Sequence, residues 1–265
     1  MEGLERGEKE LHRVRLIGLG RAGRSLMSAL QDVGWLVVGT RVHGDSLADA
    51  AEGVDALVIS TPDDEVARVA AEVTPVPSTV VLHLSGSLGL GVLAPHPRRA
   101  AMHPLAPLPS PEIGARRLRS GGVFAVTGDP LVSEMARALG GRPVEVTDAN
   151  RSIYHAAACV ASNHLVALLG QVERLARAVG LELDDYLDLA SAALEDVRAL
   201  GPAAALTGPA ARGDVRTLQR HRQALFSAGL GTADLAAYDA CAELARSLAQ
   251  AGIPVDVSSE MPACR

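Results

Sequence analysis

The sequence predicts an α/β protein in which a doubly wound, mostly parallel sheet is followed by an all-α C-terminal domain. Short apolar strands alternate with helical patterns up to residue 148, and a glycine-rich turn follows the first strand. Beyond residue 148 the strand pattern stops and only helical patterns remain. We therefore expect a disordered lead-in at residues 1–13, a sheet domain at residues 14–148 and a helical domain at residues 149–265.

The glycine-rich turn is GLGRAG at residues 18–23, between the apolar strand VRLI and a helical pattern. This is G-x-G-x-x-G in the strand–turn–helix context of a dinucleotide-binding (Rossmann) unit. The glycines permit a tight turn and approach of the backbone to a pyrophosphate, which the helix N-terminus attracts. The alternative is a glycine-rich turn without a ligand. We assign to cofactor binding Gly18, Gly20, Arg21, Ala22 and Gly23.

The second strand, WLVVGTR at residues 35–41, indicates which cofactor is bound. A carboxylate usually stands about 20 residues after the motif and binds the adenosine ribose. This sequence has Thr40 and Arg41 there, and an arginine can pair with a 2′-phosphate. NADP is therefore predicted, with NAD less favoured, unless Arg41 is only a solvated charge.

The alternation continues with the strands DALVIS, STVVLHLSG, RAAMHPLAPL, GVFAVTG and RPVEVT, and with helices at residues 61–73 and 130–140. Ligands of such sheets bind beyond the carboxyl ends of the strands. The residues at those ends are Ser60, Thr61 and Pro62, which we assign to the cofactor, and Ser85, Gly86 and His103. The acidic run at residues 63–65 suits the first turn of a helix better than a metal site.

The first helix of the second half is predicted to run from Asp148, as N-cap, to Gly180. On a 3.6-residue period, one face of it carries polar groups among alanines. That face comprises His155, Cys159, Ser162, Asn163 and Val166. Three further helices follow, over residues 183–200, 208–229 and 232–252.

Composition excludes several classes of function. With 48% hydrophobic residues among 265 the chain can bury a core, and a net charge of −6 with 2% aromatic residues argues against nucleic-acid binding. Cys159, Cys241 and Cys264 have neither metal-ligand nor disulfide spacing, as in a reducing cytoplasm. We expect no signal peptide, no metal site and no membrane span, because no apolar run reaches about 18 residues.

Six stretches carry a family resemblance over the folded chain: VRLIGLGRAGRSL, STPDDEVARVA, LHLSGSL, MHPLAPL, YHAAACVASNHLVALL and LTGPAARGD. In this order they resemble a family of Rossmann-like proteins with a C-terminal helical domain of unknown function. More distantly, that family is similar to the 6-phosphogluconate dehydrogenase C-terminal-domain superfamily, with ketopantoate reductase, prephenate dehydrogenase and pyrroline-5-carboxylate reductase as cousins. The resemblance implies a nicotinamide-binding domain, a helical domain that often dimerises, and an active site between them.

One departure from the cousins bears on catalysis. Ketopantoate and hydroxyacid reductases carry a lysine on the first long helix, where this chain has His155, and Lys9 is the only lysine of the sequence. Hydride transfer to a carbonyl leaves an oxyanion that needs a proton, which histidine can supply near neutral pH. We therefore expect His155 to be the general acid, Asn163 to bind the substrate oxygen and Ser85 to assist. A core histidine held by the backbone is the alternative for His155.

Further substrate contacts are expected from Ser162 and His103, and from the stretch LTGPAARGD. There Thr207 could cap a helix whose N-terminus, with Arg212, would hold a substrate carboxylate. The alternative is a structural cap with Arg212 paired to Asp214 or Asp239. His103 could equally be a turn residue.

The predicted function is an NADP-dependent oxidoreductase acting on a small carboxylate-bearing carbonyl, hydroxyl or imine compound, in the cytoplasm. The alternative is a dinucleotide-binding regulatory protein without turnover, and a deazaflavin-linked NADP oxidoreductase is a weaker one. A homodimer is expected from the alanine- and leucine-rich helices, although packing within one chain would explain the same composition.

Overall fold

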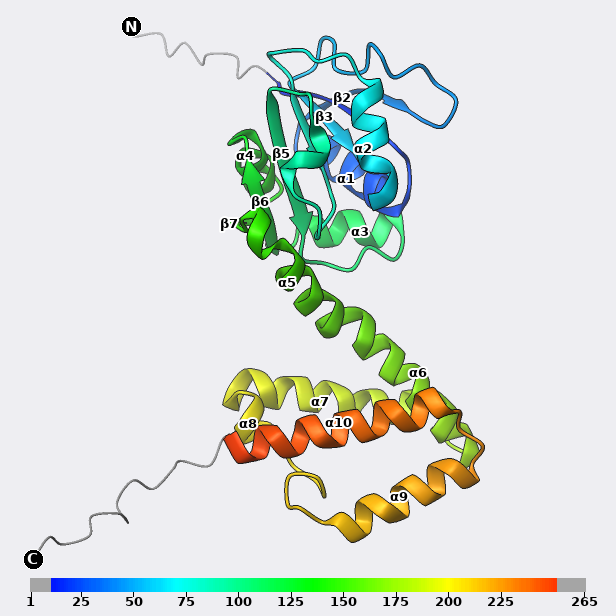
Figure 1. The fold of residues 1–265 in the computed structure, drawn as a ribbon. Coiled ribbons are helices and arrows are strands. Elements are labelled where there is room, and N and C mark those ends of the chain that lie inside the picture. The colour runs from blue at the N-terminus through cyan, green and yellow to red at the C-terminus, as the bar shows by residue number, and fades with distance from the viewer. Residues whose placement is uncertain (1–10, 252–265) are drawn as a thin grey trace, which may run out of the picture. The chain divides into compact units, whose positions relative to one another are not determined.

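The computed structural model describes residues 11–251 and confirms the predicted fold class, a mostly parallel sheet followed by helices (Figure 1). Residues 1–10 of the expected lead-in, and Cys264, lie outside the described residues. The first strand begins at Arg13, one residue before the predicted start of the sheet domain.

The sheet of the first half has the strand order β2-β1-β3-β4-β5-β6-β7. All neighbouring strands are parallel except β5 and β6, which are antiparallel. The switch point between the two windings lies at β1 and β3, where ligands of such sheets bind. The strands are β1 (Arg13–Ile17), β2 (Leu36–Arg41), β3 (Ala56–Ile59), β4 (Val80–His83), β5 (Arg98–Pro104), β6 (Val123–Gly128) and β7 (Arg142–Glu145).

Two apolar clusters cover the two faces of this sheet, because successive strand residues point to opposite faces. Val58 and Leu82 belong to the cluster with α1, α3 and α4, whereas Leu57 and Val81 belong to the cluster with α2. The helices are α1 (Arg21–Asp32), α2 (Asp63–Glu72), α3 (Pro111–Leu118) and α4 (Leu131–Ala138), with the 3-10 turn η1 (Leu90–Leu93) between β4 and β5.

The helix α3 is absent from the sequence-based prediction. It begins with Pro111, and the Ser110 side chain accepts a hydrogen bond from the backbone N–H of Ile113 at 3.3 Å. Gly114 in its middle lowers helix propensity, but a Cβ there would lie 2.1 Å from the Ser25 hydroxyl oxygen of α1. Close packing of α3 against α1 therefore accounts for the glycine in the middle of this helix.

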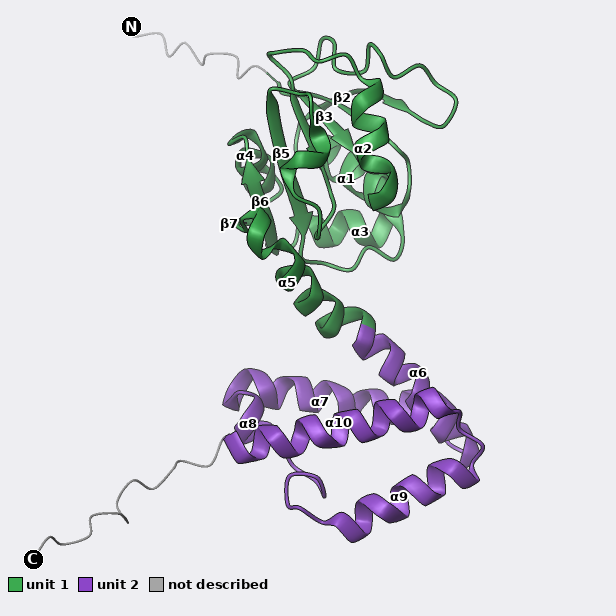
Figure 2. Ribbon diagram, viewed as in Figure 1, with its two compact units in different colours: residues 1–163 green, residues 164–265 purple. Residues whose placement is uncertain are grey.

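The chain divides into two compact units, residues 1–163 and residues 164–265, drawn in different colours in Figure 2. The division falls within a continuous helical segment, Asp148–Ala178, rather than at residue 148, where the strand pattern ends. The predicted boundary at residue 148 stays a prediction. The helices of this part are α5 (Asp148–Cys159), the π-helical turn η2 (Val160–His164), α6 (Leu165–Ala178), α7 (Asp184–Leu200), α8 (Pro202–Ala205), α9 (Val215–Ser227) and α10 (Thr232–Ala251).

A π-helical turn interrupts the segment on which the sequence predicts a polar face. A π turn contains one more residue than an α turn, so the residues after it are rotated relative to a 3.6-residue period. Ser162 is partly buried, as are His155 and Cys159, whereas Asn163 and Val166 are exposed. The shared face of the five residues stays a prediction.

The segment Asp148–Ala178 is also apolar enough, by length and mean hydropathy (1.3), to cross a membrane, and its most apolar window is not buried. The sequence analysis missed this because histidine, serine and asparagine interrupt the apolar run. Such a property is weak evidence on its own, since helices that pack in soluble proteins share it.

The predicted helix at residues 208–229 begins later than expected, and the predicted cap is wrong. Residues 209–213 form a turn with positive φ at Gly208 and Gly213, and α9 begins at Val215. Asp214 is the N-cap, because its carboxylate accepts a hydrogen bond from the N–H of Thr217 at 3.0 Å. Thr207 therefore caps no helix.

Candidate active site

The glycine turn after β1 has the geometry that dinucleotide binding requires. Gly18 has φ +89°, and a Cβ there would lie 3.0 Å from the Ser60 carbonyl oxygen. A Cβ at Gly23 would lie 2.4 Å from the Ser60 hydroxyl oxygen, so this glycine lets α1 approach β3. At Gly20, in contrast, nothing lies within 4 Å of the Cβ position. The backbone there is open to a ligand.

Helix α1 presents its N-terminus at this open position. Arg21 and Ala22 are its first residues, and Gly20 before them offers no side chain to cap the free N–H groups. The first turn also carries no acidic side chain. The helix dipole and the free N–H groups therefore favour an anion such as a pyrophosphate.

The residues after β3 support this turn. The Ser60 hydroxyl donates to the Gly18 carbonyl oxygen at 2.7 Å, which uses its proton within the protein. The Thr61 hydroxyl is buried without a hydrogen-bond partner, and Pro62 precedes α2 as its N-cap. Ser60 thus shapes the predicted cofactor site rather than facing it.

Arg41 lies at the carboxyl end of β2, beside the glycine turn. Its carbonyl oxygen accepts a hydrogen bond from the N–H of Gly18 at 2.9 Å. Its guanidinium forms an ion pair with Asp49 at 3.3 Å, a partner that the sequence analysis did not identify. Arg41 is therefore placed where an adenosine ribose binds in this fold, but it is not a freely solvated charge.

Ser85, expected to assist catalysis, is tied into a small hydrogen-bond network at the end of β4. Its hydroxyl donates to the Asp63 carboxylate at 2.7 Å and accepts from the N–H groups of Ser87 and Leu88, each at 3.1 Å. Ser87 also donates to Asp63, at 2.9 Å. Asp63 thus joins the N-terminus of α2 to this loop, so the Ser85 proton is committed to Asp63.

Arg151 in the second turn of α5 is the largest fully buried side chain of the chain's described part. One nitrogen donates to the Ser85 carbonyl oxygen at 2.6 Å, while Nε and Nη1 are buried without partners. Asp148, one turn earlier, accepts a hydrogen bond from the Leu90 N–H at 2.9 Å. These two contacts attach the start of α5 to the loop after β4.

This attachment brings His155 against the same loop. A Cβ on Gly86 would lie 2.5 Å from the His155 ring and 3.1 Å from the His103 ring, so only glycine leaves room here. The two imidazoles are perpendicular, with centroids 5.5 Å apart. His103 Nδ1 shares a hydrogen bond of 2.8 Å with the Tyr154 hydroxyl. The structure therefore gathers two predicted histidines and one tyrosine that the sequence analysis missed.

Burial and the Arg151 charge set the protonation of this group. The pKa of His103 is lowered to about 4, mainly by burial and then by the charges of His155 and Arg151. Burial also raises the pKa of Tyr154. His83 in β4 has a pKa lowered to about 4 for the same first reason, with Arg151 contributing. At neutral pH His83, His103 and Tyr154 are thus uncharged.

The other predicted residues lie farther along the chain. Cys159 is 3.9 Å from His155 Nε2, one helical turn on, and Ser162 is partly buried in the π turn. Asn163 is exposed, and its role with the substrate stays a prediction. Thr207 and Arg212 belong to the second unit, and their roles stay predictions.

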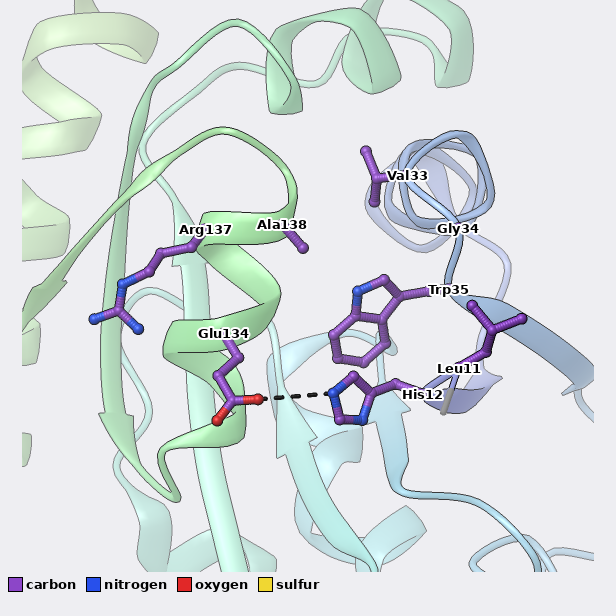
Figure 3. A pocket seen from close by; sticks show the side chains of 8 residues that line it. All are labelled: Leu11, His12, Val33, Gly34, Trp35, Glu134, Arg137 and Ala138. Carbon is purple, nitrogen blue, oxygen red and sulfur yellow. Dashed lines mark ion pairs between the residues drawn. The ribbon is translucent and has the colours of Figure 1, made fainter. Parts of the chain in front are cut away.

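A different hollow, of about 450 Å³, lies at the amino end of β1, opposite the glycine turn (Figure 3). His12 stacks on Trp35 with ring centroids 4.6 Å apart and is 3.7 Å from the Glu134 carboxylate. The Arg137 side chain points away from both rings. Among the described residues no group of three His, Cys, Asp or Glu side chains is arranged to bind a metal ion.

Comparison with known proteins agrees with this fold. Residues 123–245 match the family described as Domain of unknown function (DUF2520), which supports the resemblance for the later part of the chain. The placement in the 6-phosphogluconate dehydrogenase-like superfamily stays a prediction. No protein of curated function matches the sequence.

Solved structures similar to the chain include a candidate NADP oxidoreductase from Bacteroides fragilis (TM-score 0.75, 19% identity, 89% of this chain and 98% of that one). An imine reductase from Aspergillus terreus, solved with NADPH4 and dibenz[c,e]azepine, has TM-score 0.63 and 16% identity over 92% and 97% of the two chains. A pyrroline carboxylate reductase from Plasmodium falciparum with NADP bound has TM-score 0.58 and 13% identity over 90% and 98%. These likenesses show the fold.

Proposed function

We propose that the protein is an NADP-dependent oxidoreductase that transfers a hydride between nicotinamide and a small carboxylate-bearing carbonyl, hydroxyl or imine compound. The observation that carries this proposal is the glycine turn: Gly20 is open to a ligand at an uncapped helix N-terminus, while Gly18 and Gly23 are closed around Ser60. Structural neighbours described as NADP oxidoreductase and imine reductase support the same reaction class.

The residues of the turn fit the cofactor that the fold implies. The pyrophosphate would bind at Gly20 and the first N–H groups of α1, and Arg41 would lie at the adenosine ribose. Gly86, where His155 and His103 lie, follows β4 at the same carboxyl edge of the sheet, and these residues would lie on the nicotinamide side of a bound dinucleotide. Bound nicotinamide supplies or accepts the hydride.

The chain's own contribution to the chemistry is a proton at the reacting oxygen or nitrogen. His155 is the general acid of this proposal, because it contacts the Gly86 backbone at the edge that carries the glycine turn. His103 is held neutral by burial and is joined to Tyr154, so this pair can orient a substrate without adding a charge. Ser85 holds Asp63 and the loop instead of donating to substrate.

Among the candidate substrates, imines are the first to test. Two neighbours are an imine reductase and a pyrroline carboxylate reductase, whose names describe reduction of a C=N bond. The carboxylate would be held by Arg212, which stays a proposal because this residue lies in the second unit.

Titration of the purified protein with NADPH and NADH, followed by nucleotide fluorescence, tests the cofactor part. Wild type should bind NADPH, and Arg41→Ala should weaken NADPH by roughly tenfold while changing NADH little, since a phosphate loses a charged partner. Turnover of cyclic imines and keto acids is then measured for wild type and His155→Ala. Binding of neither nucleotide at high micromolar concentration would refute the proposal.

A non-catalytic, dinucleotide-binding regulator is the outcome if NADPH binds and no substrate is turned over. This alternative is supported by the absence of a lysine at His155, where ketopantoate and hydroxyacid reductases carry one. The two functions differ in the His155→Ala variant, which should keep NADPH affinity in both cases but has a rate to lose only in an enzyme.

A cytoplasmic homodimer completes the proposal. No residue of α7 or α10 is buried within the described chain, and large apolar side chains such as Leu189, Phe226 and Leu244 are each more than 60% exposed. A surface of this kind is typical of helices that pack against another copy. Sedimentation velocity should give a dimer, and a stable monomer at micromolar concentration would remove this part.

A further inference from the structure

The ion pair between Arg41 and Asp49 lies where the fold predicts recognition of the adenosine ribose. Asp49 Oδ2 is 3.3 Å from the Arg41 guanidinium, and the side chains are 28% and 56% exposed for Arg41 and Asp49 respectively. An exposed pair of this kind is weak, so a bound phosphate can compete for Arg41. The position of the Asp49 carboxylate then decides whether a phosphate bound at Arg41 lies beside a second negative charge.

The backbone that carries Asp49 is firmly anchored. Arg15 in β1 donates through one nitrogen to the carbonyl oxygens of Asp49, Ala50 and Glu52, at 3.3, 2.7 and 3.1 Å. Gly39 lies opposite Arg15 in β2, and a Cβ there would only be in ordinary van der Waals contact with Arg15 Nε, at 3.8 Å. These three hydrogen bonds oppose a shift of the loop that would carry Asp49 away from Arg41.

The next residues are held just as closely. Thr79 at the start of β4 donates to the carbonyl oxygens of Ala51 and Val54, at 2.7 and 2.8 Å. Ala50 and Ala51 are fully buried in the cluster beneath α2. Rotation of the Asp49 side chain is then the most direct way for the carboxylate to leave Arg41.

We propose that Asp49 is a specificity-determining residue that opposes Arg41: it disfavours the 2′-phosphate of NADPH and accepts a hydrogen bond from the 2′-hydroxyl of NADH. This inference rests on the proposed nucleotide binding. A carboxylate held beside the guanidinium repels a dianionic phosphate and cancels part of the attraction of Arg41. The same carboxylate is the acceptor that an unphosphorylated ribose needs. The protein therefore binds both nucleotides, with a smaller preference for NADPH than Arg41 alone would give.

The test is a titration of wild type, Asp49→Asn and Asp49→Ala with NADPH and with NADH at low salt. The ratio of the two dissociation constants, NADH over NADPH, should rise roughly tenfold in both variants, because NADPH gains and NADH loses affinity. The rise should shrink at about 0.5 M salt, which screens charges. Glu52→Gln is the matched control, since it removes one charge from the same exposed segment without a contact to Arg41, and it should leave the ratio unchanged.

Each outcome decides the proposal. If wild type binds neither nucleotide, the proposed function fails and the role of Asp49 fails with it. If wild type binds both nucleotides and the ratio in the Asp49 variants equals that of Glu52→Gln, nucleotide binding stands and Asp49 has no role in specificity. Fluorescence of Trp35, buried on the other side of the sheet, reports whether each variant is folded.

Discussion

Replacement of His83 by leucine should make the first unit more resistant to mild acid. His83 is fully buried in β4, and neither ring nitrogen has a hydrogen-bond partner in the described structure. Its pKa is lowered from 6.5 to about 4, first by burial and second by the Arg151 charge. The folded chain therefore keeps this imidazole neutral under conditions in which the unfolded chain protonates it.

The sign and size of the effect follow from this difference. Because the unfolded chain binds the proton more tightly, stability is full above the unfolded pKa and falls as the pH decreases from 6.5 toward 4. Between about pH 7 and pH 5, one such histidine lowers the free energy of unfolding by about 2 kcal/mol. Leucine has no proton to bind, and it is close to histidine in volume. The variant should lose about 2 kcal/mol less than wild type over this range.

Denaturant unfolding followed by Trp35 fluorescence measures the stability of the first unit, because Trp35 is the single tryptophan and belongs to the sheet core. Wild type and His83→Leu are compared at both pH values, with the exposed His43→Gln as control. Only the change with pH is compared, since leucine also alters packing at every pH. If His83→Leu loses as much stability as wild type between the two pH values, the reasoning about a buried neutral histidine is wrong.

Three further substitutions probe the site and the helical unit. Gly86→Ala should lower turnover by at least tenfold with little change in NADPH affinity, because its Cβ would lie 2.5 Å from the His155 ring; steady-state kinetics and titration check this. Arg151→Met should raise the pKa of His103, since the Arg151 charge contributes to lowering it, and NMR titration of the imidazole resonances would show no change if that charge were irrelevant. Asp214→Ala should destabilise α9 by about 1 kcal/mol through loss of its N-cap, measured by amide hydrogen exchange of that helix, with Asp214→Asn retaining most of the protection.

The proposed cofactor site could be placed in the sequence because its signals are local. The glycines of the turn, the helix after it and Arg41 lie within about two dozen residues, and each has a conformational or electrostatic reason to be where it is. The structure added the partner of Arg41. Asp49 follows eight residues later in a turn with no regular pattern; Arg15 holds its backbone carbonyl and Arg41 its carboxylate.

The proposed catalytic half of the site depends on contacts between residues that are distant in the sequence. Ser85 meets Asp63 across 22 positions, Arg151 meets Ser85 across 66, and His103 meets Tyr154 across 51. Sequence reasoning named Ser85, His103 and His155 one at a time from their places at strand ends and on a helix. The sequence carried no signal for Tyr154.

The sequence by itself determined the fold class, the strand that leads into the glycine turn and the change from strands to helices, because hydrophobic period and glycine positions act over a few residues. Tertiary structure alone decided which way side chains turn along the first long helix and which partners neutralise or orient them. A π turn at Val160–His164 interrupts the helix that the sequence predicts as continuous, and packing against Gly86 brings His155 to His103. Helical register and protonation depend on what surrounds a residue in space, and local sequence patterns do not report contacts between residues that are distant in the chain.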